Sequence, residues 1–139
     1  MRRNFFATPF VALALTLSAC TAGPAAVPGD AQLVVDLKEY SVNLSVASVK
    51  AGRVKIAVRN SGTMEHEFEL IKTDIAPDKL PQDSVSAKAK EDGLVKQAKG
   101  IGIGRLVNVT ADLQAGSYVI ICNVPGHYQL GMQAGLKVE

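Results

Sequence analysis

The sequence predicts an all-β protein, a Greek-key β-sandwich with one short helical excursion. Short segments recur in which every second residue is apolar, the pattern of strands that bury one face. Turn-forming Gly, Pro, Asn and Ser residues separate most of these segments. With 139 residues, of which 47% are hydrophobic, the chain is long enough for one domain with an ordinary core.

Seven segments carry the strand pattern. In GRVKIAV, for example, Val54, Ile56 and Val58 alternate with other residues, and the RNSG that follows has the composition of a turn. The tetrapeptide AGSY predicts a tyrosine corner, in which the hydroxyl of Tyr118 bonds to nearby backbone. The predicted strands are 32–37, 40–49, 52–58, 64–70, 105–113, 117–122 and 135–139.

The middle of the chain, residues 73–100, has a different composition. It is rich in Pro, Asp, Lys and Ala, and Asp83 or Ser84 can serve as the N-cap of a short helix that runs to about Lys99. The GIGIG at 100–104 lacks the glycine spacing and the strand-to-helix context of a phosphate-binding loop. We expect its glycines to allow a bend into the next strand.

The N-terminus has the features of an export signal. Two arginines precede an apolar stretch, which is too short and wrongly flanked for a transmembrane helix. LSAC resembles a bacterial lipobox, in which Cys20 becomes the lipidated first residue; the alternative is an ordinary signal peptide cut elsewhere in SACTAGPAA. We therefore divide the chain into a lipoprotein signal peptide (1–19), a flexible tether (20–30) and a folded domain (31–139).

This division predicts an exported protein, lipid-anchored in the bacterial cell envelope and facing the periplasm. The residue after Cys20 is not Asp, which favours the outer membrane. Removal of residues 1–19 also removes Arg2 and Arg3, so 15 − 2 = 13 basic residues face 13 acidic ones and the formal net charge becomes zero. A nucleic-acid partner is not expected, because it requires clustered surplus Lys and Arg.

Four soft or imidazole side chains form the candidate site. His66 lies on the core-facing side of a predicted strand, where a His needs a partner. Cys122, the only thiol left if Cys20 carries lipid, is followed by His127 and Met132 in the spacing C-x4-H-x4-M. This spacing suits a loop between two adjacent strands, and two His, one Cys and a weak axial Met are the ligands of a blue-copper electron-transfer site.

At these residues the sequence resembles the cupredoxins, the small blue copper proteins, and their rusticyanin and sulfocyanin-like branch in particular. The resemblance covers CNVPGHYQLGM, AGSYVIIC and the distant HEF. It implies a cupredoxin-like fold and one copper ion, Cu(I) or Cu(II), held in the plane by Cys122, His66 and His127 and axially by Met132. His127 then faces solvent through an apolar docking patch of Pro125, Tyr128 and Leu130.

One position departs from the family pattern. Many cupredoxins have Asn or Ser after the first His, and that side chain braces the thiolate loop. Here the position is Glu67, whose carboxylate cannot donate a hydrogen bond as an amide does. Only its backbone N–H is left for that role.

The resemblance implies a carrier of single electrons that is not an enzyme. Expected partners are redox proteins such as cytochromes or a terminal reductase or oxidase, and the membrane through the lipid anchor; we expect a monomer. The alternative is a copper-binding module for trafficking, storage or resistance. A Cys–His nucleophile and a zinc site are further alternatives. We expect Met64, on the face of His66, to pack in the core; its other role would be as a second Cu(I) thioether.

Overall fold

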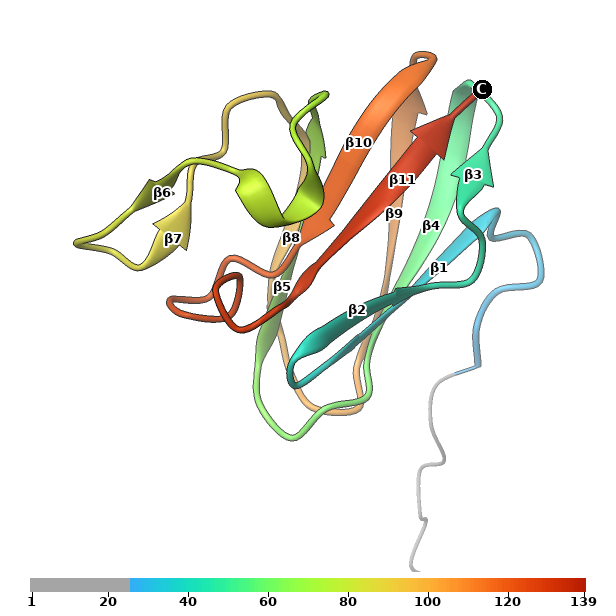
Figure 1. Ribbon diagram of the computed structural model, residues 1–139. Helices are drawn as coiled ribbons and strands as arrows, with labels where there is room; N and C mark the ends of the chain where they lie inside the picture. Colours follow the sequence, from blue (N-terminus) through green and yellow to red (C-terminus); the bar gives the residue numbers. More distant parts are fainter. Residues whose placement is uncertain (1–25) are drawn as a thin grey trace, which may run out of the picture.

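The computed structural model describes residues 26–139, and these form two β-sheets packed face to face (Figure 1). The four-stranded sheet has the order β2-β1-β4-β9 and the five-stranded sheet the order β3-β11-β10-β5-β8. The pairs β1–β4 and β3–β11 are parallel, and the other pairs of the two sheets are antiparallel. The strands are β1 (Leu33–Lys38), β2 (Ser41–Leu44), β3 (Ser48–Val49), β4 (Gly52–Asn60), β5 (His66–Lys72), β8 (Leu94–Ile101), β9 (Leu106–Leu113), β10 (Gly116–Ile121) and β11 (Gln133–Val138).

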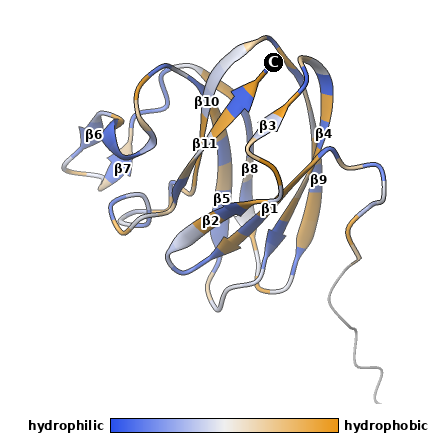
Figure 2. Ribbon diagram, turned by 45° about the vertical axis from the view of Figure 1, so that its right-hand side comes forward, coloured by the Kyte–Doolittle hydropathy of each residue, from blue (hydrophilic) through white to orange (hydrophobic). Residues whose placement is uncertain are grey.

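The main core lies between the two sheets. Side chains alternate between the faces of each strand, so every second residue points inward, and the apolar colouring of Figure 2 follows this alternation. In β5, for example, Phe68 and Leu70 are fully buried between the sheets. The predicted all-β sandwich is therefore confirmed. The core also includes Val35, Leu37, Ile56, Val58, Tyr118, Ile120, Cys122, Met132 and Leu136.

The predicted helix to Lys99 is wrong. Residues 82–89 form a small antiparallel pair, β6 (Gln82–Asp83) and β7 (Lys88–Ala89), and β8 then completes the five-stranded sheet beside β5. Burial in β8 alternates residue by residue up to Lys99, and Ala98 pairs with Phe68. Pairing with a sheet edge therefore outweighs the helix propensity of Ala and Lys. Within residues 26–139 the helical content is one 3₁₀ turn, η1 (Pro77–Lys79).

Two local predictions are confirmed. Gly100 and Gly104 have φ angles of +65° and +69°, and the chain bends between them from β8 into β9. The hydroxyl of Tyr118 donates to the carbonyl oxygen of Gln114 at 2.9 Å, which is the predicted tyrosine corner. The signal peptide, Cys20 and the first part of the tether lie outside the described residues. The part of the chain that is described contains no helix long and apolar enough to cross a membrane.

Candidate metal centre

The four predicted ligand residues converge at one end of the sandwich. His66 begins β5, Cys122 directly follows β10, His127 lies in the loop after it, and Met132 directly precedes β11. His66, Cys122 and Met132 are fully buried, and His127 is 5% exposed. The fold therefore brings a residue of one strand to a loop more than fifty positions later, and His127 is the member of the set that reaches solvent.

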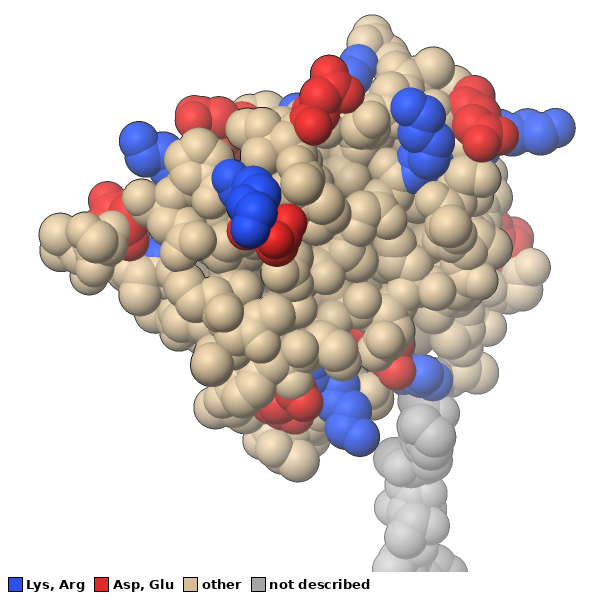
Figure 3. Space-filling model, viewed as in Figure 1, with Lys and Arg blue, Asp and Glu red and all other residues tan. Residues whose placement is uncertain are grey.

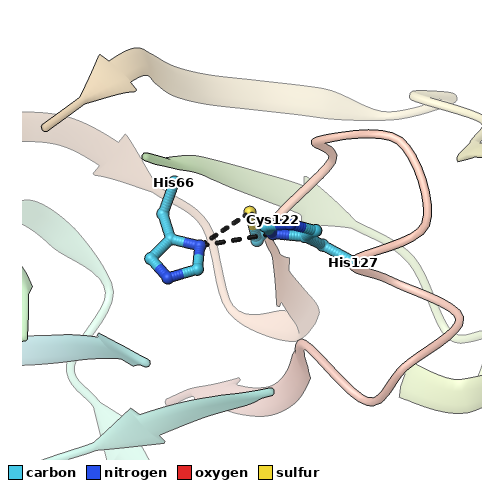
Figure 4. A group of neighbouring side chains, drawn as sticks. All are labelled: His66, Cys122 and His127. Carbon is cyan, nitrogen blue, oxygen red and sulfur yellow. Dashed lines mark hydrogen bonds between the residues drawn. The ribbon is translucent and has the colours of Figure 1, made fainter. Parts of the chain in front are cut away.

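Three of these side chains point their ligand atoms at one another (Figure 4). The Nδ1 atoms of His66 and His127 are 3.3 Å apart. The sulfur of Cys122 lies 3.6 Å from Nδ1 of His66 and 3.4 Å from Nδ1 of His127. The three atoms thus form a nearly equilateral triangle from two imidazoles and one thiol.

This triangle has the size that a metal ion needs. A point at its centre lies about 2.0 Å from each atom, the mean side divided by √3. Bonds from a borderline-soft metal to imidazole nitrogen and thiolate sulfur are roughly 2.0–2.3 Å long. The donor set of two nitrogens and one soft sulfur is that of a trigonal copper site. The residues present therefore fit copper.

Met132 is joined to the other loop ligands through its backbone. Its N–H donates to the carbonyl oxygen of His127, and its own carbonyl oxygen accepts from the N–H of Cys122, both at 3.1 Å. Its side chain is fully buried in the same core cluster as Cys122. The C-x4-H-x4-M loop is therefore closed on itself next to the site, with the thioether-bearing residue at its end.

His66 has a partner that the sequence did not indicate. Its second ring nitrogen, Nε2, lies 3.1 Å from Oε1 of Glu39 in the turn between β1 and β2. The carboxylate accepts the Nε2 proton, which leaves the lone pair of Nδ1 free to face the centre. A carboxylate behind a metal-binding His fixes the tautomer and orients the ring. Glu39 is therefore part of the site.

Glu39 is itself held in place. The same Oε1 accepts the backbone N–H groups of Thr63 and Met64, each at 2.8 Å. Its own backbone N–H, followed by those two, holds the pKa of the Glu39 carboxyl below its usual range. A Cβ at Gly62 would overlap this carboxylate, so the close approach requires glycine there. No local sequence signal indicates this role of Glu39, because a Glu in a turn is common. Its contact with residues 62–66 depends on the pairing of β1 with β4, which is a long-range feature.

The surroundings of the loop ligands keep them neutral before a metal binds. Burial, the largest cause, raises the pKa of the Cys122 thiol, although the backbone N–H of Glu67 donates to its sulfur at 3.2 Å. Burial and the nearby His66 lower the pKa of His127, so its imidazole is a neutral ligand. The expectation that Glu67 serves the thiol through its backbone N–H is confirmed by this bond to the Cys122 sulfur.

Two expectations about neighbouring residues are wrong. Tyr128 is not part of an exposed docking patch: it is 3% exposed, and its hydroxyl bonds inward to the segment before β6. Met64 does not pack in the core: it is 43% exposed, because β5 begins only at His66 and the preceding loop turns outward. Of the predicted patch, Pro125 and Leu130 are exposed. Tyr40 joins them, with its ring edge-on to His127 at 5.6 Å between centroids.

A buried carboxyl lies behind the site. Glu69 lies on the face of β5 opposite Phe68 and Leu70, and its side chain is fully buried on the outer face of the five-stranded sheet. Burial, the largest cause, and the nearby carboxylate of Glu91 raise its pKa to about 7. Lys99 lies 3.6 Å away as an ion-pair partner, and the side-chain amide of Asn123 donates to it at 3.1 Å. Glu69 is buried because other segments of the chain pack on this face of the sheet, which the alternation along the strand does not indicate.

Fold and site together define a small copper-binding β-sandwich protein. The family model "Copper binding proteins, plastocyanin/azurin family" matches residues 31–139, and the chain belongs to this family, the cupredoxins. Copper is therefore its cofactor, and the centre formed by His66, Cys122 and His127 is suited to a single ion. A comparison with curated protein sequences gives no match.

Solved structures with the same fold include rusticyanin and two auracyanins, one of them described as a "blue" copper protein. Rusticyanin from Thiobacillus ferrooxidans is 18% identical, with a TM-score of 0.58 over 77% of this chain and 75% of that chain. Auracyanin from Roseiflexus castenholzii is 20% identical, with a TM-score of 0.53 over 78% and 98%. Auracyanin A from Chloroflexus aurantiacus is 22% identical, with a TM-score of 0.54 over 76% and 96%. At these identities the likeness supports the fold.

Proposed function

We propose that this protein is a mononuclear blue copper protein that carries single electrons between redox partners in the bacterial cell envelope. The observation that carries the proposal is the triangle of His66, Cys122 and His127, whose ligand atoms already stand 3.3–3.6 Å apart. When bound, copper would supply a one-electron couple between Cu(II) and Cu(I). A site that is buried and braced before metal binds changes its geometry little on electron transfer.

The route for electrons is proposed to pass through His127. It is the one ligand of the four that is not fully buried. Tyr40 packs edge-on against its ring, and Pro125 and Leu130 are exposed in the same loop, so these three residues form the revised docking patch. Leu130 is 57% exposed and Tyr40 43%, so this patch presents two large apolar side chains to a partner that docks by apolar contact. Cytochromes or a terminal reductase or oxidase are the proposed partners.

The charge pattern fits a partner recognised by shape and apolar contact. Figure 3 shows acidic and basic side chains scattered in small groups of both signs on the face drawn, with uncharged surface between them. Without its first 19 residues the chain has a formal net charge of zero. Strong electrostatic steering is therefore not expected, and association should depend weakly on salt.

The proposed location is the periplasmic side of the cell envelope, with Cys20 lipidated, residues 20–30 as a tether and the protein monomeric. The support is the lipobox-like LSAC after an apolar signal. Incorporation of labelled fatty acid into the wild-type protein, and none into Cys20→Ala, would bear this out. Equal labelling of the two, or none of either, would contradict it.

The direct test of the carrier proposal is addition of Cu(II) to the purified protein. We expect an intense blue or green thiolate-to-copper absorption band and reversible one-electron voltammetry. Binding of colourless Cu(I) alone, without reversible redox chemistry, would overturn the carrier proposal.

One observation favours a second candidate function, copper trafficking. Met64 is 43% exposed two residues before His66, so its thioether is accessible to an incoming Cu(I) ion. Trafficking predicts that Met64→Leu slows Cu(I) transfer from a chelated donor while leaving the absorption band and the voltammetry unchanged. An electron carrier predicts no change in any of the three.

A further inference from the structure

The chain between β5 and β8 forms a layer of its own on the outer face of the five-stranded sheet (Figure 1). We call residues 77–91 the strap; they contain η1, β6 and β7. A second apolar cluster joins the strap to the sheet and to the ligand loop. Its buried members are Ile71, Leu80, Ala89, Val119, Ile121 and Tyr128. The strap is thus packed against the back of the metal centre.

The residues that follow two of the loop ligands, Cys122 and His127, contact the strap. Cys122 belongs to the core between the sheets, whereas Asn123, one position later, is fully buried on the opposite side. The Asn123 side chain pairs with one strap residue in the manner of a neighbouring strand. Its Oδ1 accepts the N–H of Ala89 at 2.9 Å, and its Nδ2 donates to the Ala89 carbonyl oxygen at 3.1 Å.

Tyr128, which follows His127, makes the second attachment. Its hydroxyl donates to the carbonyl oxygen of Pro77 and accepts the N–H of Leu80, both at 2.8 Å. This buried hydroxyl is therefore used in both directions, so its loss would leave two strap groups without partners.

A backbone bond between these two attachments makes the third. The N–H of Gly126 donates to the carbonyl oxygen of Ala87 at 2.8 Å. Both residues have positive φ angles, +85° for Gly126 and +52° for Ala87. The loop and the strap therefore meet here in special backbone conformations, and the loop is fixed at three points within six residues.

We propose that the strap holds Cys122 and His127 in ligand geometry, with Asn123 and Tyr128 as positioning residues. The loop needs such a support because Glu67, the residue after His66, offers the thiol only its backbone N–H. Asn123 and Tyr128 anchor the main chain directly beside each ligand, so a loosened strap displaces the two ligand atoms themselves. The proposal rests on the copper site but not on electron carriage.

The test compares two buried tyrosines. Tyr128→Phe removes the hydroxyl that binds the strap, and Tyr118→Phe removes a hydroxyl that makes a bond of similar length, 2.9 Å, to Gln114 in the turn between β9 and β10. Asn123→Ala removes the other side-chain attachment. Each variant is studied metal-free by hydrogen exchange of the Gly126 and Ala89 amides, and Cu(II)-loaded by electron paramagnetic resonance and by the ratio of the two thiolate-to-copper bands.

We expect Tyr128→Phe and Asn123→Ala to speed exchange at Gly126 by tenfold or more and to shift the copper hyperfine splitting and band ratio. Tyr118→Phe should leave all three as in the wild type. Wild-type exchange and spectra in a folded Tyr128→Phe protein would overturn the proposal, as would an equal change in Tyr118→Phe. If Asn123→Ala does not fold, Tyr128→Phe decides alone. If the wild type shows no reversible redox chemistry while exchange follows the prediction, the carrier function fails and the strap proposal stands.

Discussion

The two sides of the metal centre are held by different means. His66 stands on a regular strand, and its ring is fixed by one charged group, the carboxylate of Glu39, at 3.1 Å. Cys122 and His127 stand on a loop, and neutral hydrogen bonds to residues 77–89 fix the main chain beside them. The strand needs help only to orient a side chain, whereas the loop has no strand partners of its own and its backbone must be fixed.

This difference predicts how each side fails. Support that rests on a single carboxylate is lost in one substitution, and the consequence falls on the metal affinity of His66. Support that is divided among several neutral hydrogen bonds is lost in steps, and each lost bond changes the geometry of the copper site more than its affinity for copper. The following predictions test this contrast, from the largest expected effect to the smallest.

Cys122→Ser should remove the thiolate ligand of the metal centre. A serine hydroxyl remains protonated at neutral pH and is a harder ligand than thiolate, so we expect complete loss of the thiolate-to-copper band and much weaker copper binding. Absorption titration with Cu(II) measures both. Leu130→Ser, on the exposed part of the same loop, is the control and should keep the band. A blue Cys122→Ser protein would show that the ligand assignment is wrong.

Glu39→Ala should weaken the His66 side alone. Loss of a carboxylate behind a metal-bound His typically costs about 10–100-fold in metal affinity, and we expect a loss in that range. Competition with a copper chelator measures it. Glu65→Gln, a change at an exposed acid next to His66 in sequence, is the control. A Glu39→Ala protein with wild-type affinity would mean that the strand orients His66 without the carboxylate.

Glu69→Gln tests the buried carboxyl beneath the strap. In the folded protein Glu69 keeps its proton up to about pH 7, whereas its ordinary pKa is 4.5. The folded state binds more protons between these values, so the stabilising contribution is present below pH 4.5 and is lost as the pH rises through 7. The charged form faces Glu67, Glu91, Lys99 and Asn123.

The Gln variant cannot ionise at this position. We therefore expect it to gain about 2–3 kcal/mol over the wild type between pH 5 and pH 8, measured by urea unfolding of the metal-free protein at both values. Glu65→Gln again serves as the exposed control. A constant difference between variant and wild type would mean that Glu69 titrates in the folded protein as it does in the unfolded chain.

Tyr118→Phe should have the smallest effect on the centre. It removes one buried hydrogen bond to Gln114, at a cost of about 1 kcal/mol in the free energy of unfolding. Thermal unfolding should show this loss, while the copper spectrum stays that of the wild type. A changed spectrum would show that the copper site responds to any change in core packing, and the proposed difference between the supports of His66 and of Cys122 and His127 would then be wrong.

Much of the site was predictable because its chemistry is local. The ligand residues Cys122, His127 and Met132 lie within eleven residues, and period-two alternation placed His66 on the inner face. The corner at Tyr118 and the bend at GIGIG also follow from short segments. The helix predicted to Lys99 failed because composition does not tell whether a neighbouring sheet edge is available.

The sequence by itself determined the fold class, the family and which side chains can bind copper, since these depend on residue type and spacing along the chain. Only the tertiary structure decided that Glu39 orients His66, that Tyr128 points inward, and that Glu69 is buried. Alternation tells which residues share a face of a strand, but long-range packing decides what covers that face. Residues 77–91 cover the outer face of the five-stranded sheet, and they bind Asn123 and Tyr128, the residues that follow Cys122 and His127.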